Sequence, residues 1–249
     1  VLNREQNHLK LNQYDVSSGE FVKTLFEEKD EKYVEPLVPM LFLKSNPSQF
    51  IWQSNRDGWN QLYQYDINGK LIRQLTKGNW EVLDVKGFDT KGENLFFVST
   101  ILSAVNKSLC AVNLKTGKIT TITPQPGVHS AQVSADGTAI LDVFSTIDNP
   151  RTIQIMDIKK PGKTKTKTLL QADNPLKDYA ATELSLFTIK NKSGDSLFCR
   201  LFKPANFSGD KKYPVIVYWY GGPHAQMILN NWNAGAGDYW FRYMAQQGY

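Results

Sequence analysis

A pattern that recurs every 44 to 51 residues through the first two thirds of the chain constrains the fold more than any other feature. A short strand-like stretch runs into a turn at Asp15, and the same pattern returns at Asp66 and Asn113, with a weaker copy at Asp157. A glycine follows within four residues in the first three copies. Because Asp and Asn bond their own backbone in turns and glycine accepts a positive φ, each copy predicts a hairpin turn between outer strands.

A second element keeps the same spacing. Residues 50–54, 95–99 and 140–145 are apolar runs that each end in serine. A repeat of about 45 residues holds four short strands, and one such sheet cannot bury both of its faces. Stacking the sheets radially buries them, which predicts a mainly β chain with three to four blades of a partial β-propeller. A β-sandwich with coincidental spacing is the alternative that the repeat leaves open. The first copy lacks its front half, so we expect an array that is incomplete at its N-terminal side.

The chain has a net charge of +5. Its lysines are scattered, except in the stretch from Lys159 to Thr168. There Lys163, Lys165 and Lys167 alternate with threonines, which places all three on one face of an extended strand. Such charges keep an edge strand from pairing with other chains. A nucleic-acid-binding tract is the competing interpretation. We do not favour it, because no aromatic residue interleaves with the lysines.

Membrane and metal binding receive no support from the sequence. No apolar run approaches the ~20 residues that span a bilayer, and the first ten residues are too polar for a signal peptide. Cys110 and Cys199 lie 89 positions apart, without zinc-ligand spacing and with only three histidines in the chain. We therefore expect no metal and no cofactor. Two buried free thiols are favoured, and a disulfide is left open.

The pattern changes near residue 175, which divides the chain into residues 1–175 and 176–249. Residues 184–189 and 197–202 flank a turn signal and predict a β-hairpin. The continuous apolar run from Pro214 to Tyr220 is typical of a central strand that is covered on both faces of an α/β sheet. The second part is thus expected to differ in class from the first.

A helix is predicted near the end of the sequence. Asp238 can cap its start, and Gly248 is a natural stop. The residues expected to share one face of this helix are Trp240, Phe241, Met244 and Ala245.

Two glycines and a proline follow directly after Tyr220. A strand, a glycine-rich turn and a later helix occur at one oxyanion-hole loop of α/β-hydrolases. Glycine lets the backbone approach a developing negative charge, and a tyrosine hydroxyl adds a hydrogen-bond donor there. Without further context, an ordinary Gly-Gly-Pro turn explains the motif equally well.

A propeller followed by a hydrolase is the domain order of the prolyl oligopeptidase group of serine peptidases, and the sequence resembles its dipeptidyl-peptidase IV subfamily, bacterial members above all. Residues 34–43 and 50–82 resemble one blade of that subfamily, including a Thr-x-Gly-x-Trp-Glu-Val ending, and residues 211–226 resemble its oxyanion segment. The likeness covers nearly the whole chain. It implies that residues 1–175 are C-terminal blades of a propeller and that residues 176–249 are the truncated start of an α/β-hydrolase domain.

The resemblance gives Tyr220 the place of the oxyanion-hole tyrosine, which would donate its hydroxyl to the tetrahedral intermediate. Gly221, Gly222 and Pro223 would shape the loop that holds it. His224 is expected to be a loop residue, because the hydrolase histidine comes last in the order Ser, Asp, His.

The other two histidines, His8 and His129, lie in blade segments, where surface or turn roles are expected. The family's nucleophile sits in a Gly-x-Ser-x-Gly pentapeptide, which this sequence does not contain. We expect the catalytic serine, aspartate and histidine to lie beyond Tyr249. The paired glutamates that grip the substrate's amino terminus are expected on a propeller segment outside this chain. The chain would be an internal fragment that is inactive by itself.

On the resemblance, the complete protein is a serine exopeptidase that releases Xaa-Pro or Xaa-Ala dipeptides from peptides. The resemblance also implies export to the periplasm or secretion, and it leaves a homodimer open. The sequence does not separate this enzyme from a prolyl tripeptidyl peptidase of the same architecture. A non-catalytic binding protein that kept the fold is a further alternative, against which the presence of Tyr220 argues.

Overall fold

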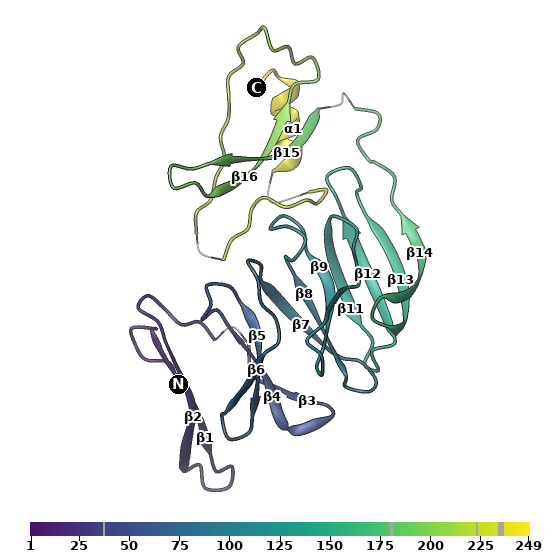
Figure 1. The fold of residues 1–249 in the computed structure, drawn as a ribbon. Helices are drawn as coiled ribbons and strands as arrows, with labels where there is room; N and C mark the ends of the chain where they lie inside the picture. Colours follow the sequence, from purple (N-terminus) through teal and green to yellow (C-terminus); the bar gives the residue numbers. More distant parts are fainter. Residues whose placement is uncertain (37, 180–181, 223, 234–236) are drawn as a thin grey trace.

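The computed structural model describes the chain except for residues 37, 180–181, 223 and 234–236. Three four-stranded antiparallel sheets follow one another, and in each of them consecutive strands pair as a meander (Figure 1). The strands of the first sheet are β3 (Leu41–Leu43), β4 (Asn46–Ser54), β5 (Gln61–Asp66) and β6 (Leu71–Gln74); of the second, β7 (Val82–Phe88), β8 (Asn94–Ser99), β9 (Ser108–Asn113) and β10 (Ile119–Thr121); of the third, β11 (Val128–Val133), β12 (Ala139–Ser145), β13 (Thr152–Lys160) and β14 (Lys163–Gln171).

A hairpin of β1 (His8–Tyr14) and β2 (Phe21–Lys29) precedes the three sheets. Its two strands correspond to the first sequence repeat, which was expected to lack its front half. The mainly β class and the prediction of three to four blades are confirmed, because the sheets stand side by side in chain order (Figure 1).

Hydrophobic clusters fill the spaces between neighbouring sheets. Phe96 and Phe97 are adjacent on β8, are fully buried, and point to opposite faces as strand geometry requires. Phe96 packs with residues of the third sheet such as Ile140, whereas Phe97 packs with residues of the first sheet such as Leu62. The second sheet therefore has no exposed face between its neighbours, which is the packing that the repeat predicted.

The predicted hairpin turns form at three of the four repeat positions. Asp15, Asp66 and Asn113 each accept backbone N–H bonds through Oδ1, and glycines with positive φ follow them. The fourth prediction is wrong, because Asp157 lies within β13, opposite Lys165. The β13–β14 ladder continues to Lys160, so its turn falls later, at Gly162.

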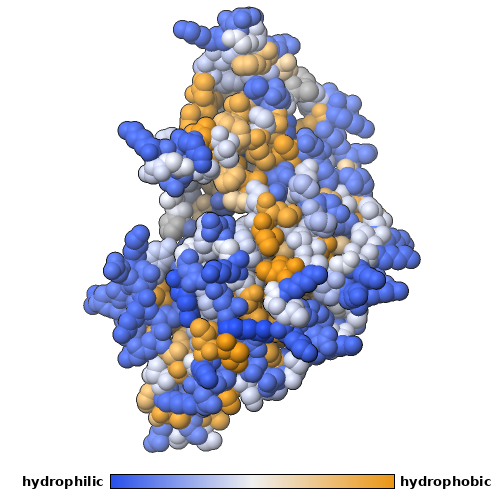
Figure 2. Space-filling model, in the orientation of Figure 1, coloured by the Kyte–Doolittle hydropathy of each residue, from blue (hydrophilic) through white to orange (hydrophobic). Residues whose placement is uncertain are grey.

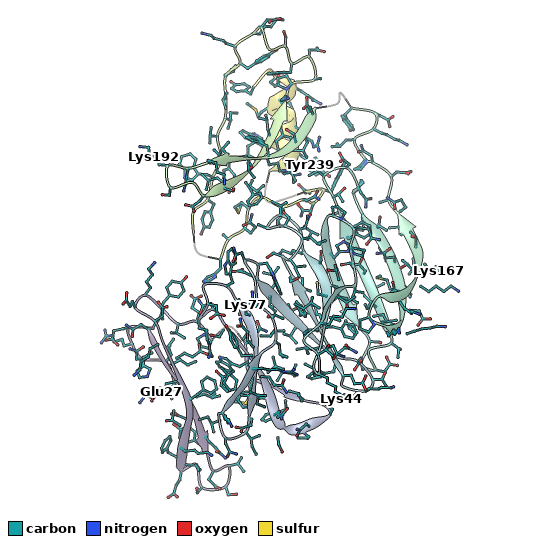
Figure 3. All side chains as sticks on the ribbon, viewed as in Figure 1. Glu27, Lys44, Lys77, Lys167, Lys192 and Tyr239 are labelled. Atoms are coloured by element: carbon teal, nitrogen blue, oxygen red, sulfur yellow. The ribbon has the colours of Figure 1, made fainter. Side chains whose placement is uncertain are left out.

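Lys163, Lys165 and Lys167 lie on β14, the edge strand of the third sheet, as predicted, whereas Lys159 and Lys160 end β13. Figure 3 shows Lys167 extending away from that edge. Among the described residues, none of the helical structure reaches the length and apolar character that crossing a bilayer requires.

The second part of the chain contains the predicted hairpin and helix. Strand β15 (Glu183–Lys190) pairs with β16 (Ser196–Lys203), and α1 spans Asp238–Gln246. Asp238 was predicted to cap this helix, and that prediction is wrong. Gly237 occupies the cap position without a side-chain cap bond, and Asp238 is the buried first residue of the helix. Its carboxylate instead binds Arg200, and a negative charge in the first turn still suits the helix dipole.

The predicted central strand from Pro214 to Tyr220 is not formed. The segment is irregular, and Val215, Val217 and Trp219 are 75%, 69% and 79% exposed. A strand needs backbone partners, and none of the described residues pairs with this segment. Figure 2 shows hydrophobic surface gathered on the upper part of the molecule, where this segment and the β15–β16 hairpin lie.

Candidate active-site loop

Tyr220 lies at the end of the exposed apolar segment, and 60% of its surface is accessible. Its ring folds back over Gly222, where a Cβ atom would fall 2.4 Å from the phenol oxygen. A side chain at position 222 would therefore make the Tyr220 ring shift, whereas a Cβ at Gly221 would meet nothing within 4 Å. Pro223, the remaining predicted residue of the loop, lies outside the described residues.

His224 directly follows this loop and is a turn residue, as predicted. Its Nε2 lies 2.8 Å from a carboxylate oxygen of Glu35, in the segment that leads into the first sheet. Its backbone φ of 61° is in the left-handed region, which is uncommon for a residue with a side chain. No local sequence pattern indicated the contact between these two residues, because 189 positions separate them.

The other histidines have structural partners within the sheets. His8 lies 2.7 Å from Glu27 on the neighbouring strand. The predicted surface or turn role of His129 is wrong, because only 3% of this residue is exposed. Its ring lies 2.8 Å from the buried carboxylate of Asp142 and 3.0 Å from the carbonyl oxygen of Gln125. Both groups satisfy a polar ring inside the third sheet and point to no catalytic role.

Arg200 of β16 organises the chain between the loop and α1. Its guanidinium donates to the carbonyl oxygens of Leu229, Asn231 and Trp232 at 2.9 to 3.2 Å. It also donates to the Asp238 carboxylate, and both side chains are 4% exposed. Burial lowers the pKa of Arg200, while the Asp238 charge acts in the opposite direction. The buried Arg200 side chain thus holds three backbone carbonyls and the first residue of α1 in place.

Glu27 and Glu28 are adjacent glutamates within this chain, whereas the pair that grips the substrate amine is expected outside it. Adjacent residues of a strand point to opposite faces. Glu28 is buried and accepts bonds from Trp52, Ser54 and Arg56, whereas Glu27 is exposed on the outer face (Figure 3). The two carboxylates do not converge, so this pair is not arranged to hold one substrate amine.

Both cysteines are free thiols, but the prediction that both are buried is wrong for Cys199, which is half-buried, whereas Cys110 is buried. Burial raises the pKa of Cys110, which disfavours its thiolate. Within the described part of the chain, no group of three or more His, Cys, Asp or Glu side chains is arranged to hold a metal ion.

An open cavity of about 410 Å³ lies beside α1, at the end of the third sheet. Its walls include Asp148, Trp232, Tyr239, Arg242 and Tyr243, and Tyr220 is not among the residues that line it. The cavity is therefore separate from the predicted oxyanion loop.

Comparison with known families decides the assignment. A family profile described as the N-terminal region of dipeptidyl peptidase IV matches residues 1–151, which is more than half of the chain. The chain belongs to the dipeptidyl peptidase IV family. Among curated relatives, dipeptidyl peptidase 4 of Arthroderma otae is 32% identical over 242 residues, and that of Trichophyton rubrum is 30% identical over the same length.

Two solved bacterial structures of the dipeptidyl peptidase IV type resemble the whole chain. One, from Bacteroides ovatus and assigned as a dipeptidyl aminopeptidase IV, has 42% identity and a TM-score of 0.89. The other, dipeptidyl peptidase 4 of Porphyromonas gingivalis, has 25% identity and a TM-score of 0.84. This chain covers 38% and 34% of those two chains and 31% of the curated relatives. The resemblance inferred from the sequence is confirmed.

Proposed function

We propose that the complete protein is a serine-type dipeptidyl peptidase that releases Xaa-Pro or Xaa-Ala dipeptides from the amino termini of peptides. In this proposal, residues 1–175 are the C-terminal blades of its propeller and residues 176–249 begin its α/β-hydrolase domain. The observation that carries the proposal is the likeness of the whole chain, Tyr220 segment included, to bacterial structures of this family.

The chemistry assigned to this chain is stabilisation of negative charge. In acyl transfer, a serine oxygen attacks the scissile carbonyl, and the carbonyl oxygen becomes an oxyanion. The Tyr220 hydroxyl would donate a hydrogen bond to that oxyanion, and a donor fixed in place before the reaction strengthens its effect. A histidine would carry the serine proton to the leaving amine. In the proposal, the serine, the histidine and its aspartate come from beyond Tyr249.

The exposure of the apolar segment supports the assignment of residues 176–249 to the start of a hydrolase domain. Val215, Val217 and Trp219 lie open, although their side chains favour burial. Strands from the rest of the proposed hydrolase domain would pair with this segment on both sides and cover it. Such pairing would place Tyr220 at the end of a central strand, where α/β sheets carry their ligands.

The test compares the full-length protein with the 249-residue chain, using Gly-Pro-p-nitroanilide and Ala-Ala-Pro-p-nitroanilide. We expect the full-length protein to hydrolyse the first substrate and to prefer it over the second, and we expect no turnover by the 249-residue chain. Preference for the second substrate would identify a tripeptidyl peptidase instead. A folded full-length protein that hydrolyses neither substrate would contradict the proposal and favour a binding protein.

We also propose that the protein is exported to the periplasm or secreted, as the resemblance implies. Cell fractionation with an antibody against the chain tests this, and recovery with cytoplasmic markers alone would contradict it.

A further inference from the structure

Residues 224–232, here called the tether, run from the Tyr220 loop along one end of the three sheets (Figure 1). The tether contacts a different loop at each sheet. Its partners are Glu35 before the first sheet, Val105 and Asn106 between β8 and β9 of the second, and Ser145 and Ile147 at the end of β12 in the third. One short segment thus joins all three sheets to the chain that carries Tyr220.

Asn230 makes the most numerous of these contacts. Its backbone N–H donates to the Val105 carbonyl at 2.8 Å, and its Nδ2 donates to Oδ1 of Asn106 at 3.0 Å. Its Oδ1 accepts from the backbone N–H of Ile147 at 3.2 Å. Asn106 itself accepts from the backbone N–H of Gly127, so Asn230 inserts where the second and third sheets meet.

Arg200 holds the same residues from the opposite side. Its guanidinium donates hydrogen bonds to the carbonyl oxygens of Leu229 and Asn231, the two neighbours of Asn230. The side chain of Asn230 is thereby directed toward the sheets while the flanking carbonyls are directed toward the hairpin. This part of the tether is clamped between the two halves of the chain, and its position is fixed by both.

The other end of the tether is held by His224. Its contact with Glu35 is more exposed, with side-chain exposures of 58% and 37%, and exposed contacts of this kind contribute little. The left-handed backbone of His224 nevertheless marks a conformation that the surroundings must hold. Gly221, Gly222 and Pro223 lie between Tyr220 and His224, and the two glycines impose little conformation of their own.

We propose that the tether positions the Tyr220 hydroxyl relative to the propeller, with Asn230 as its main anchor and His224 as a secondary one. The inference rests on the proposed function, because it assigns Asn230, His224 and Glu35 as positioning residues for the oxyanion donor. A substrate held by the propeller and attacked in the hydrolase domain needs that donor at a fixed place between the two. A displacement of about 1 Å can cost up to about a hundredfold in rate.

The test uses the full-length protein and Gly-Pro-p-nitroanilide. Asn230→Ala should lower kcat about tenfold and change KM by less than about twofold, because the donor acts on the transition state. Asn233→Ala, the same change at an exposed position beside the tether, should leave both constants unaltered. In a Tyr220→Phe background, Asn230→Ala should lower kcat by less than about twofold further, because there is no hydroxyl left to misplace.

An equal loss in both backgrounds would show that Asn230 has only a structural role, and would overturn the proposal. If Asn230→Ala does not fold, Glu35→Gln and His224→Gln provide the test. Each single variant should lower kcat about threefold, and the double variant should have the same kcat as either single variant. Full additivity of the two losses in kcat would show that Glu35 and His224 do not act together, and would overturn the proposal.

Hydrogen exchange separates failure of this inference from failure of the proposed function. Asn230→Ala should speed amide exchange in residues 224–232 relative to Asn233→Ala, whether or not the protein is a peptidase. If the wild-type protein shows no turnover but this difference in exchange appears, Asn230 does anchor the tether and only the proposed function is wrong. If exchange is the same in both variants, the tether is not anchored by Asn230 and the inference is wrong.

Discussion

Strand β8 and the segment from Pro214 to Tyr220 are both short apolar runs bounded by turn residues, yet only the first forms a buried strand. Every residue of β8 is buried, and it pairs with β7 and β9. The second run is exposed and pairs with none of the described strands. The partners of β8 lie close in sequence and are joined to it by short loops. An apolar run therefore becomes a strand only where the chain also supplies its neighbours.

Alanine substitutions in these two runs should differ strongly in their effect on the free energy of unfolding. Phe97→Ala removes a fully buried ring from the cluster between the first and second sheets and should cost about 3–5 kcal/mol in the free energy of unfolding. Val217→Ala removes methyl groups from an exposed site and should change it by less than about 0.5 kcal/mol. Urea unfolding of the 249-residue chain measures both. Similar losses would show that the second run is packed in solution.

Arg200 organises the second part of the chain through polar contacts, in contrast to the apolar contacts that hold β8. Arg200→Ala leaves the Asp238 carboxylate without its buried cation and frees three carbonyls, with a cost of about 3 kcal/mol. The loss should be local. Hydrogen exchange should speed up in α1 and in residues 229–232 while β8 stays protected. Uniform exposure of both regions would indicate one cooperative unit instead.

A pair of glycines tests how closely the sheets themselves approach each other. A Cβ at Gly69 would fall 2.1 Å from the Leu25 carbonyl oxygen of β2, whereas a Cβ at Gly117 would meet nothing within 4 Å. Both residues have positive φ, so each change to alanine should cost about 1 kcal/mol in backbone strain. Gly69→Ala should cost at least about twice that, because the β1–β2 hairpin must move. Equal thermal unfolding of the two variants would contradict the close packing.

What could be predicted from the sequence follows the same division. The turns at Asp15, Asp66 and Asn113 are local chemistry between a side chain and the next few amides, so spacing was enough to find them. The contact between Glu35 and His224 depends on the tertiary fold, and local patterns do not encode it. The Asp238 cap was mispredicted for a related reason, since a buried arginine from a distant strand took the carboxylate.

The candidate site was likewise only partly readable from sequence. Gly222 lies beside the Tyr220 ring, while the role of the Gly-Gly motif in an oxyanion loop stays a prediction. Asn230 and Arg200 carried no motif, because their roles arise from backbone carbonyls and amides that only the fold brings near them. The segment that ends at Tyr220 was misjudged as a strand because its apolar character is visible in sequence while its missing partners are not.

The smallest expected effect lies on the outer face of the first hairpin. The hydrogen bond from His8 lowers the pKa of Glu27 from its ordinary 4.5 to about 2, and the Lys10 and Lys29 charges act in the same direction. A lowered folded-state pKa stabilises the fold above pH 4.5, and this stabilisation disappears as the pH falls toward 2. Glu27→Gln should therefore unfold slightly more easily than wild type at neutral pH, and this difference should vanish near pH 2.

Urea midpoints measured across that pH range test the prediction, with Glu20→Gln on the same hairpin as the exposed control. A difference that persists unchanged to pH 2 would show that the Glu27 charge is not its source.

The kcat of Tyr220→Phe in the full-length protein is the sharpest test of the proposal that Tyr220 donates a hydrogen bond to the oxyanion of a peptidase reaction. The change removes one oxygen and keeps the ring. We expect a fall of about 10²–10³ in kcat on Gly-Pro-p-nitroanilide, with KM changed by less than about threefold. Undiminished kcat in a folded Tyr220→Phe variant would contradict the assignment of this loop.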